Sequence, residues 1–148
     1  MACSVSKKLE TICAELGARL TVPRCDVFSV IAKADKPVGA YDILRLMPEG
    51  TKPPTVYRAL EFLESVHLIH RIESLNAYVL CCDGHGHEHS AQFAICQSCG
   101  DVQEMQIPAL EKILKDSHFK GVGFKPLATS MEIRGVCMKC DDHNAPPV

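Results

Sequence analysis

The chain has 148 residues, of which 47% are apolar and 23% charged. This composition is typical of one or two folded domains and excludes a disordered chain. No apolar run approaches the ~18 residues of a membrane span, so we expect no membrane protein. The N-terminus lacks the basic-then-apolar layout of a signal peptide, which predicts a cytoplasmic protein. The formal net charge of −2 gives no support for bulk binding to nucleic acid.

The cysteines and charges divide the chain near residue 81. The first eighty residues contain ten Lys and Arg against nine Asp and Glu, and the remainder contains six against nine. Six of the nine cysteines and five of the seven histidines lie in the second part. Nine cysteines in a cytoplasmic chain indicate metal or redox chemistry. We expect one domain over 1–81, a hinge with two glycines over 82–86 and a second domain over 87–148.

The first part shows the periodicity of four helices followed by a hairpin. The first helix ends at Gly17, the second opens near Pro23, and the fourth opens at Pro53 because proline is tolerated in the first helical turn. Two apolar runs, 68–72 and 78–80, flank a polar turn and predict a β-hairpin. This order is that of a winged helix-turn-helix. The apolar stripes of the helices are Leu9, Ile12, Cys13 and Leu16; Val27, Val30 and Ile31; Ala40, Ile43, Leu44 and Met47; and Val56, Ala59, Leu60 and Leu63.

The second part mixes strands with one helix. Strands are predicted over 92–96 and 102–105 around a tight turn, and an alternating run over 129–136 predicts a third. A helix opens between them at Pro108. The fold class is therefore α+β, with a winged helix-turn-helix domain followed by a small α/β domain.

Two Cys-x-x-Cys pairs carry the most specific chemical signal. They are Cys96 with Cys99 and Cys137 with Cys140. A two-residue spacer lets both thiolates face one tetrahedral cation, and four thiolates close a structural zinc site. The interval between the pairs exceeds the ~15–20 residues of a zinc ribbon, so the metal would join the two ends of this domain. The alternatives are a thioredoxin-like redox motif and cysteines without a ligand.

A second group of metal-binding side chains has looser spacing. It comprises His70, Cys81, His85, His87, His89 and Glu104. A mixture of imidazole, thiolate and carboxylate suits zinc better than magnesium or calcium. The pair His87 and His89 lacks the spacing of a zinc protease. A solvated histidine-rich loop that binds metal adventitiously explains these residues equally well.

The predicted fourth helix has the properties of a DNA-recognition helix. Its apolar stripe would face the core and leave Thr55, Tyr57, Arg58 and Glu61 outward. Arginine can bind guanine through two hydrogen bonds in the major groove, and tyrosine can pack on a thymine methyl group or bind a phosphate. An ordinary solvated helix face is the alternative.

These motifs together resemble the ferric uptake regulator superfamily, and most closely its zinc uptake regulator branch. The resemblance covers Ile12 to Cys140 and rests on Lys52–Leu60, His70–Ser74, Tyr78–Cys81 and the two Cys-x-x-Cys pairs. The iron-sensing branches carry a His-His-Asp-His run where this chain has Ser90–Phe93, so an iron-type site is missing.

The resemblance implies a zinc-responsive homodimeric repressor with two zinc ions per subunit. A structural zinc would bind Cys96, Cys99, Cys137 and Cys140 in the dimerisation domain. A regulatory zinc would bind His70, Cys81, His89 and Glu104, with His85 or His87 as replacements for His89. The DNA contacts would come from Tyr41, Thr55, Tyr57 and Arg58, on palindromic, AT-rich operators.

Other functions compete with this hypothesis. The chain has no nucleophile–base pair, so a hydrolase is disfavoured, and its Cys-x-x-Cys pairs do not follow a βαβ unit as in a thiol oxidoreductase. We expect no enzyme and no small-molecule substrate. A repressor that senses iron, manganese or nickel and a zinc-buffering protein are the remaining alternatives. No ligand role is predicted for Cys3, Cys13, Cys25 or Cys82.

Overall fold

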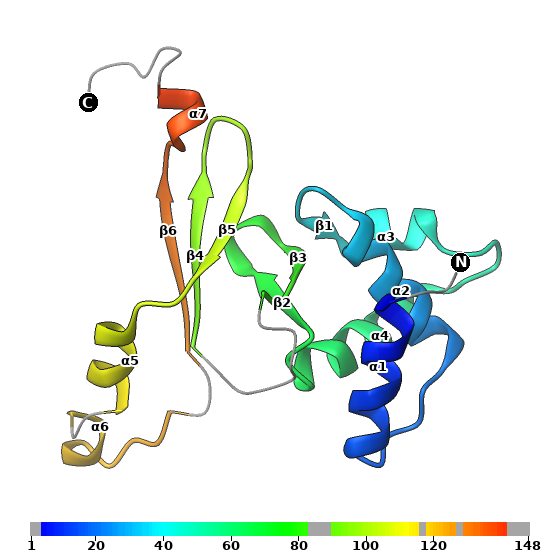
Figure 1. Ribbon diagram of the computed structural model, residues 1–148, viewed down its shortest axis with the longest axis horizontal. Helices are drawn as coiled ribbons and strands as arrows, with labels where there is room; N and C mark the ends of the chain where they lie inside the picture. The colour runs from blue at the N-terminus through cyan, green and yellow to red at the C-terminus, as the bar shows by residue number, and fades with distance from the viewer. Residues whose placement is uncertain (1–3, 83–89, 116–117, 127–128, 142–148) are drawn as a thin grey trace. The chain divides into compact units, whose positions relative to one another are not determined.

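The computed structural model describes residues 4–82, 90–115, 118–126 and 129–141. The chain divides into two compact units, Met1–Glu88 and His89–Val148. Each unit combines helices with its own three-stranded sheet, which confirms the predicted α+β class (Figure 1). No helix among the described residues is both long and apolar enough to cross a membrane.

The first unit has the predicted winged helix-turn-helix order. Its hairpin, β2 and β3, is joined by a short strand that sequence periodicity did not predict, because β1 has only two residues. β1 pairs antiparallel with β3, with Val38 opposite Tyr78. The elements are α1 (Ser4–Glu15), α2 (Val22–Lys33), β1 (Val38–Gly39), α3 (Ala40–Leu46), α4 (Pro53–Ser65), β2 (Ile69–Ile72), the 3-10 helix η1 (Glu73–Leu75) and β3 (Ala77–Leu80).

The apolar stripes of the four helices meet in one core. Leu9 of α1, Ile43 of α3 and Leu63 of α4 are fully buried. The prediction for Leu16 is wrong: α1 ends one residue earlier, and this side chain is 59% exposed. The reason is Gly17, whose left-handed φ of +61° turns the chain away from the helix.

The second unit is built on a sheet of order β5-β4-β6. β4 runs antiparallel to β5 but parallel to β6, with Ala91 opposite Ser130 and Cys96 opposite Gly135. Parallel neighbours need a long crossover, and the connection here contains β5, α5 and α6. The elements are β4 (Ala91–Cys96), β5 (Val102–Met105), α5 (Pro108–Lys115), α6 (His118–Gly121), β6 (Ser130–Gly135) and α7 (Met138–Asp141).

A truncation in the core of the first unit tests this packing. Leu63→Ala should lower the free energy of unfolding by about 2–5 kcal/mol, because it removes buried methyl groups and leaves a cavity. Leu46→Ala is the matched control, since Leu46 is 67% exposed and should change stability by less than about 0.5 kcal/mol. Urea titration followed by circular dichroism measures both. Equal effects would contradict the assigned core.

Candidate metal sites and recognition helix

The sheet of the second unit brings the two cysteine pairs to one edge. Cys96 is the last residue of β4, and β6 ends at Gly135, directly opposite it. Because the strands are parallel, the Cys-x-x-Cys segments that follow them leave the sheet at the same end. After Cys96 the chain turns back through Gly100, whose φ of +73° favours glycine. The N–H of Gly100 donates to the carbonyl of Cys96, at 2.9 Å.

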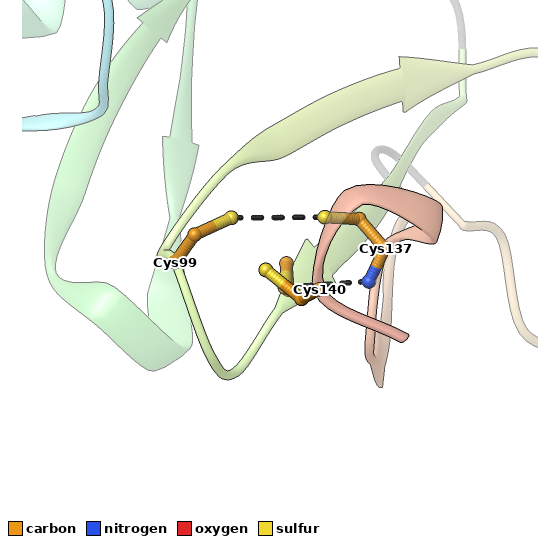
Figure 2. Close-up of side chains that lie close together, drawn as sticks. Cys99, Cys137 and Cys140 are labelled. Carbon is orange, nitrogen blue, oxygen red and sulfur yellow. Dashed lines mark hydrogen bonds between the residues drawn. The ribbon is translucent and has the colours of Figure 1, made fainter. Parts of the chain in front are cut away.

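The four thiols fit one tetrahedral zinc ion. The sulfurs of Cys96, Cys99, Cys137 and Cys140 all lie within 4.8 Å of one another. The Sγ atoms of Cys99 and Cys137 are 3.8 Å apart, which is the edge of about 3.8 Å that Zn–S bonds of 2.3 Å give a regular tetrahedron. Figure 2 shows these two thiols facing each other, with Cys140 of α7 beside them. The arrangement matches a closed structural site rather than a redox pair.

Ionisation of this quartet explains why it suits a cation. The backbone N–H of Cys137 donates to Cys96 Sγ at 3.3 Å and is the main cause that lowers the pKa of Cys96 to about 6. Hydrogen bonding with the Cys137 thiol raises the pKa of Cys140 to about 12. One thiolate therefore forms easily, whereas the proton of another is strongly held. A zinc ion bound by the four cysteines would remove this conflict, because it binds thiolates and displaces their protons.

The hairpin of the first unit brings two further ligand atoms together. His70 on β2 lies opposite Val79 on β3, and Cys81 lies two residues beyond Val79 on the same face. A backbone hydrogen bond fixes the position of Cys81: its N–H donates to the carbonyl of Leu68 at 3.0 Å. An imidazole nitrogen of His70 and the sulfur of Cys81 lie within 4.8 Å of each other, compared with about 3.6 Å for two such ligands on one zinc ion. Both residues are buried.

The other predicted regulatory ligands belong to the second unit. Glu104 is half-buried on β5, opposite Phe93 of β4. His89 and its predicted replacements, His85 and His87, lie outside the described residues.

Helix α4 presents the predicted base-reading residues away from the core. Val56 and Leu60 are buried, while Tyr57 is 53% exposed and Arg58 is also exposed. Thr55 is half-buried in the first turn, where its N–H donates to the carbonyl of Lys52. On α3, Tyr41 is 72% exposed. The rings and hydroxyl groups of both tyrosines are therefore accessible to a binding partner.

Comparison with known proteins agrees with this geometry. A sequence model of the ferric uptake regulator family matches residues 15–134. The chain belongs to the ferric uptake regulator family. It is 38% identical over 134 residues to the zinc uptake regulation protein of Escherichia coli (strain K12), covering 88% of this chain and 78% of that protein.

Two solved structures of zinc uptake regulators have the same fold as this member of the ferric uptake regulator family. Holo XcZur is 39% identical, with a TM-score of 0.84 over 94% of this chain and 99% of that chain. A zinc uptake regulator complexed with zinc and DNA is 36% identical, with a TM-score of 0.85 over 92% of each chain. The chain thus belongs to the zinc uptake regulator branch of the family.

One side-chain contact of helix α4 was not predicted from the sequence. The guanidinium carbon of Arg24 lies 3.4 Å from the centroid of the Phe62 ring. No local spacing indicates this contact, because the two residues lie on different helices, α2 and α4, which pack only in the folded unit.

Loss of one thiol tests the structural role of the quartet. Cys96→Ser should lose the chelation-resistant zinc and give unfolded or monomeric protein, since zinc binding supplies on the order of 10–16 kcal/mol in small zinc domains. Cys25→Ser, outside the quartet, is the control and should keep the metal. Zinc content after mild chelation, together with size-exclusion chromatography, measures both effects. A folded, dimeric Cys96→Ser protein would show that the site is not structural.

Proposed function

We propose that this chain is a zinc-responsive transcriptional repressor of zinc-uptake genes. The observation that carries the proposal is the pair Tyr57 and Arg58, exposed on a helix whose opposite face is buried in a winged helix-turn-helix core. The likeness to a zinc uptake regulator complexed with zinc and DNA supports it. A protein of this kind is a regulator rather than an enzyme, and it works with the DNA in the cytoplasm.

The proposed DNA surface consists of Tyr41, Thr55, Tyr57 and Arg58. In helix-turn-helix proteins, residues near the start of the recognition helix contact base edges, and three of these four lie in the first two turns of α4. Arg58 would bind guanine O6 and N7, while the tyrosines would contact thymine methyl groups or phosphates. Such contacts read an AT-rich operator with guanines at fixed positions.

Two zinc ions per subunit have separate roles in this proposal. The thiolate quartet holds a structural ion with no open position. The regulatory ion binds His70, Cys81, His89 and Glu104, a mixed set of nitrogen, sulfur and oxygen ligands. Both sites require ligands to lose protons, so the regulatory response weakens as acid pH protonates histidine and cysteine.

The regulatory ion acts by fixing the two units relative to each other. His70 and Cys81 come from the first unit, and His89 and Glu104 come from the second. One ion bound by all four restricts the angle between the units. In a homodimer this angle sets the distance between two recognition helices, which must match the half-site spacing of a palindromic operator. Coupling free energies of about 1–3 kcal/mol are typical of such switches.

Exposed apolar side chains on the second unit support its role in dimerisation. Val122 and Phe124 follow α6 and are 76% and 61% exposed. Ile113 on α5 and Ile133 on the edge strand β6 are also exposed. A second copy of this unit would remove these apolar side chains from water, which favours association. A dimer also pairs two recognition helices, as a palindromic operator requires.

Two alternatives share this fold. A regulator of iron, manganese or nickel would use the same helix. The thiolate of Cys81 in the regulatory set favours zinc over manganese, which prefers oxygen ligands, and the similarity to zinc uptake regulators favours zinc over iron and nickel. A zinc-buffering protein would need no exposed base-reading residues. A gel-shift assay of operator DNA with each metal distinguishes the three.

Arg58→Ala tests base reading. It should weaken operator binding by about 1–3 kcal/mol and relax the preference for one base pair in each half-site. Zinc content should not change. Lys33→Ala removes another exposed cation, at the end of α2, and is the control. Fluorescence anisotropy with operator and random DNA measures affinity, and an equal loss on both would make Arg58 a phosphate contact.

Cys81→Ser and His89→Ala test the regulatory site. Both proteins should stay folded and dimeric and keep the structural zinc, because the thiolate quartet is intact. Both should fail to bind operator when zinc is added. Cys82→Ser, which changes the adjacent exposed thiol, should respond normally. If Cys81→Ser and His89→Ala also respond normally, the proposed crosslink between the units is wrong.

A further inference from the structure

One arginine in the first unit connects three segments around the recognition helix. Arg24 lies in the first turn of α2. Its guanidinium carbon is 3.4 Å from the ring centroid of Phe62 on α4. Its Nη1 also donates a hydrogen bond to the carbonyl of Arg19, in the loop between α1 and α2. The side chain therefore joins the start of α2 to the preceding loop and to α4.

The position of Arg24 is unfavourable without these partners. The N-terminal end of a helix carries partial positive charge, which disfavours a cation in the first turn. The Arg19 carbonyl and the π face of Phe62 both present negative potential to the guanidinium and offset this cost. Arg24 and Phe62 are each half-buried, so water screens the contact less than at an exposed site.

The partner of Arg24 lies close to the proposed base-reading residue. Phe62 follows Arg58 by four residues, so the two side chains project from adjacent turns of the same face of α4. On the other side of the helix, Val56, Leu60 and Leu63 pack into the core. Burial of one face of α4 sets which side of the helix points to the core, and Phe62 packs at the border of that core. The guanidinium stacked on the Phe62 ring adds a contact of defined geometry on the outward side. The contact between Arg24 and Phe62 is thus suited to narrowing the small rotations of α4 about its own axis that the core packing still permits.

We propose that Arg24 is a positioning residue for DNA recognition, which acts through Phe62 to hold α4 at the rotation that aims Arg58 at its base. The inference rests on the proposed function, because it assigns Arg24 a part in operator recognition. Arg24 itself needs no contact with a base. Its loss should reduce discrimination between operator and random DNA, since misplaced base contacts weaken only the specific complex.

A double-mutant cycle tests this role in the full-length, zinc-loaded protein. Arg24→Met and Phe62→Leu should each weaken operator binding about three- to tenfold, the effect of losing a partly desolvated cation–π contact. The double variant should be no weaker than the weaker single variant, because both changes remove one interaction. Binding to random DNA should change less than about twofold in all three, since phosphate contacts are kept.

Two matched variants distinguish a positioning role of Arg24 from an effect of its positive charge. Arg19→Met removes the neighbouring exposed guanidinium but keeps the carbonyl that Arg24 uses, so the ratio of operator to random affinity should not change. Arg24→Lys keeps the charge but lacks the planar group, and it should restore only part of that ratio. The slope of log affinity against log salt should be the same for Arg24→Met and wild type. A slope reduced by about one would make Arg24 a phosphate contact and overturn the proposal.

Hydrogen exchange of the free protein provides a readout without DNA. Arg24→Met and Phe62→Leu should speed amide exchange in the C-terminal half of α4 to a similar degree, with no further increase in the double variant. Additive effects in either cycle would overturn the role of Arg24. If zinc-loaded wild type itself fails to bind operator, the proposed function is wrong, and non-additive exchange would still support the Arg24–Phe62 coupling.

Discussion

The parallel pairing of β4 with β6 is the constraint on which the second unit depends. The register from Ala91 opposite Ser130 to Cys96 opposite Gly135 determines where both strands end. Because they end together, two cysteine pairs far apart in the sequence meet at one edge. A slip by one residue would turn alternate side chains to the wrong face and move Cys96 away from its partners. Zinc at the quartet would in turn hold this register, since its four bonds need both strand ends in place. Strand pairing and metal binding therefore support each other.

The two units obtain their stability in different ways. The first has a conventional core, in which residues from all four helices and the hairpin pack together. In the second, the buried apolar side chains of the described residues are few and come from β4, with Phe93 the largest. A unit of this size buries too little apolar surface for ample stability on its own, and metals commonly compensate in such domains. The closed thiolate shell suits this role, because four thiolates leave no open position on the metal. The proposed regulatory site differs in ligand type, since His70 and Cys81 offer it an imidazole and a thiolate.

Local patterns predicted most of this structure, and long-range geometry supplied the rest. Periodicity located the helices, and the prolines at 53 and 54 marked the start of α4, because these signals depend on neighbouring residues. The Cys-x-x-Cys spacing likewise identified the quartet before its sulfurs were seen within 4.8 Å of one another. Spacing could not choose His70 and Cys81 from the other histidines and cysteines, because their approach depends on the register of β2 and β3. Residue spacing also did not predict the parallel pairing of β4 with β6 or the stacking of Arg24 on the Phe62 ring. The prediction for Leu16 was wrong because one left-handed glycine ended α1 early.

The low net charge of the first unit makes operator affinity depend strongly on how the two recognition helices of the proposed repressor are placed. Its first eighty residues carry a formal excess of only one positive charge. Phosphate neutralisation supplies most of the sequence-independent affinity of DNA-binding proteins, and a net charge this low adds little long-range attraction to DNA. Operator binding then depends on base contacts and on two recognition helices held at the correct spacing. A protein with strong background binding would stay on DNA when its geometry failed. In the two proposals made above, a zinc ion that restricts the angle between the units and an arginine that restricts the rotation of α4 would both control the placement of Arg58 in the groove. Weak electrostatics is therefore the condition under which a modest conformational restriction can decide whether the operator is bound.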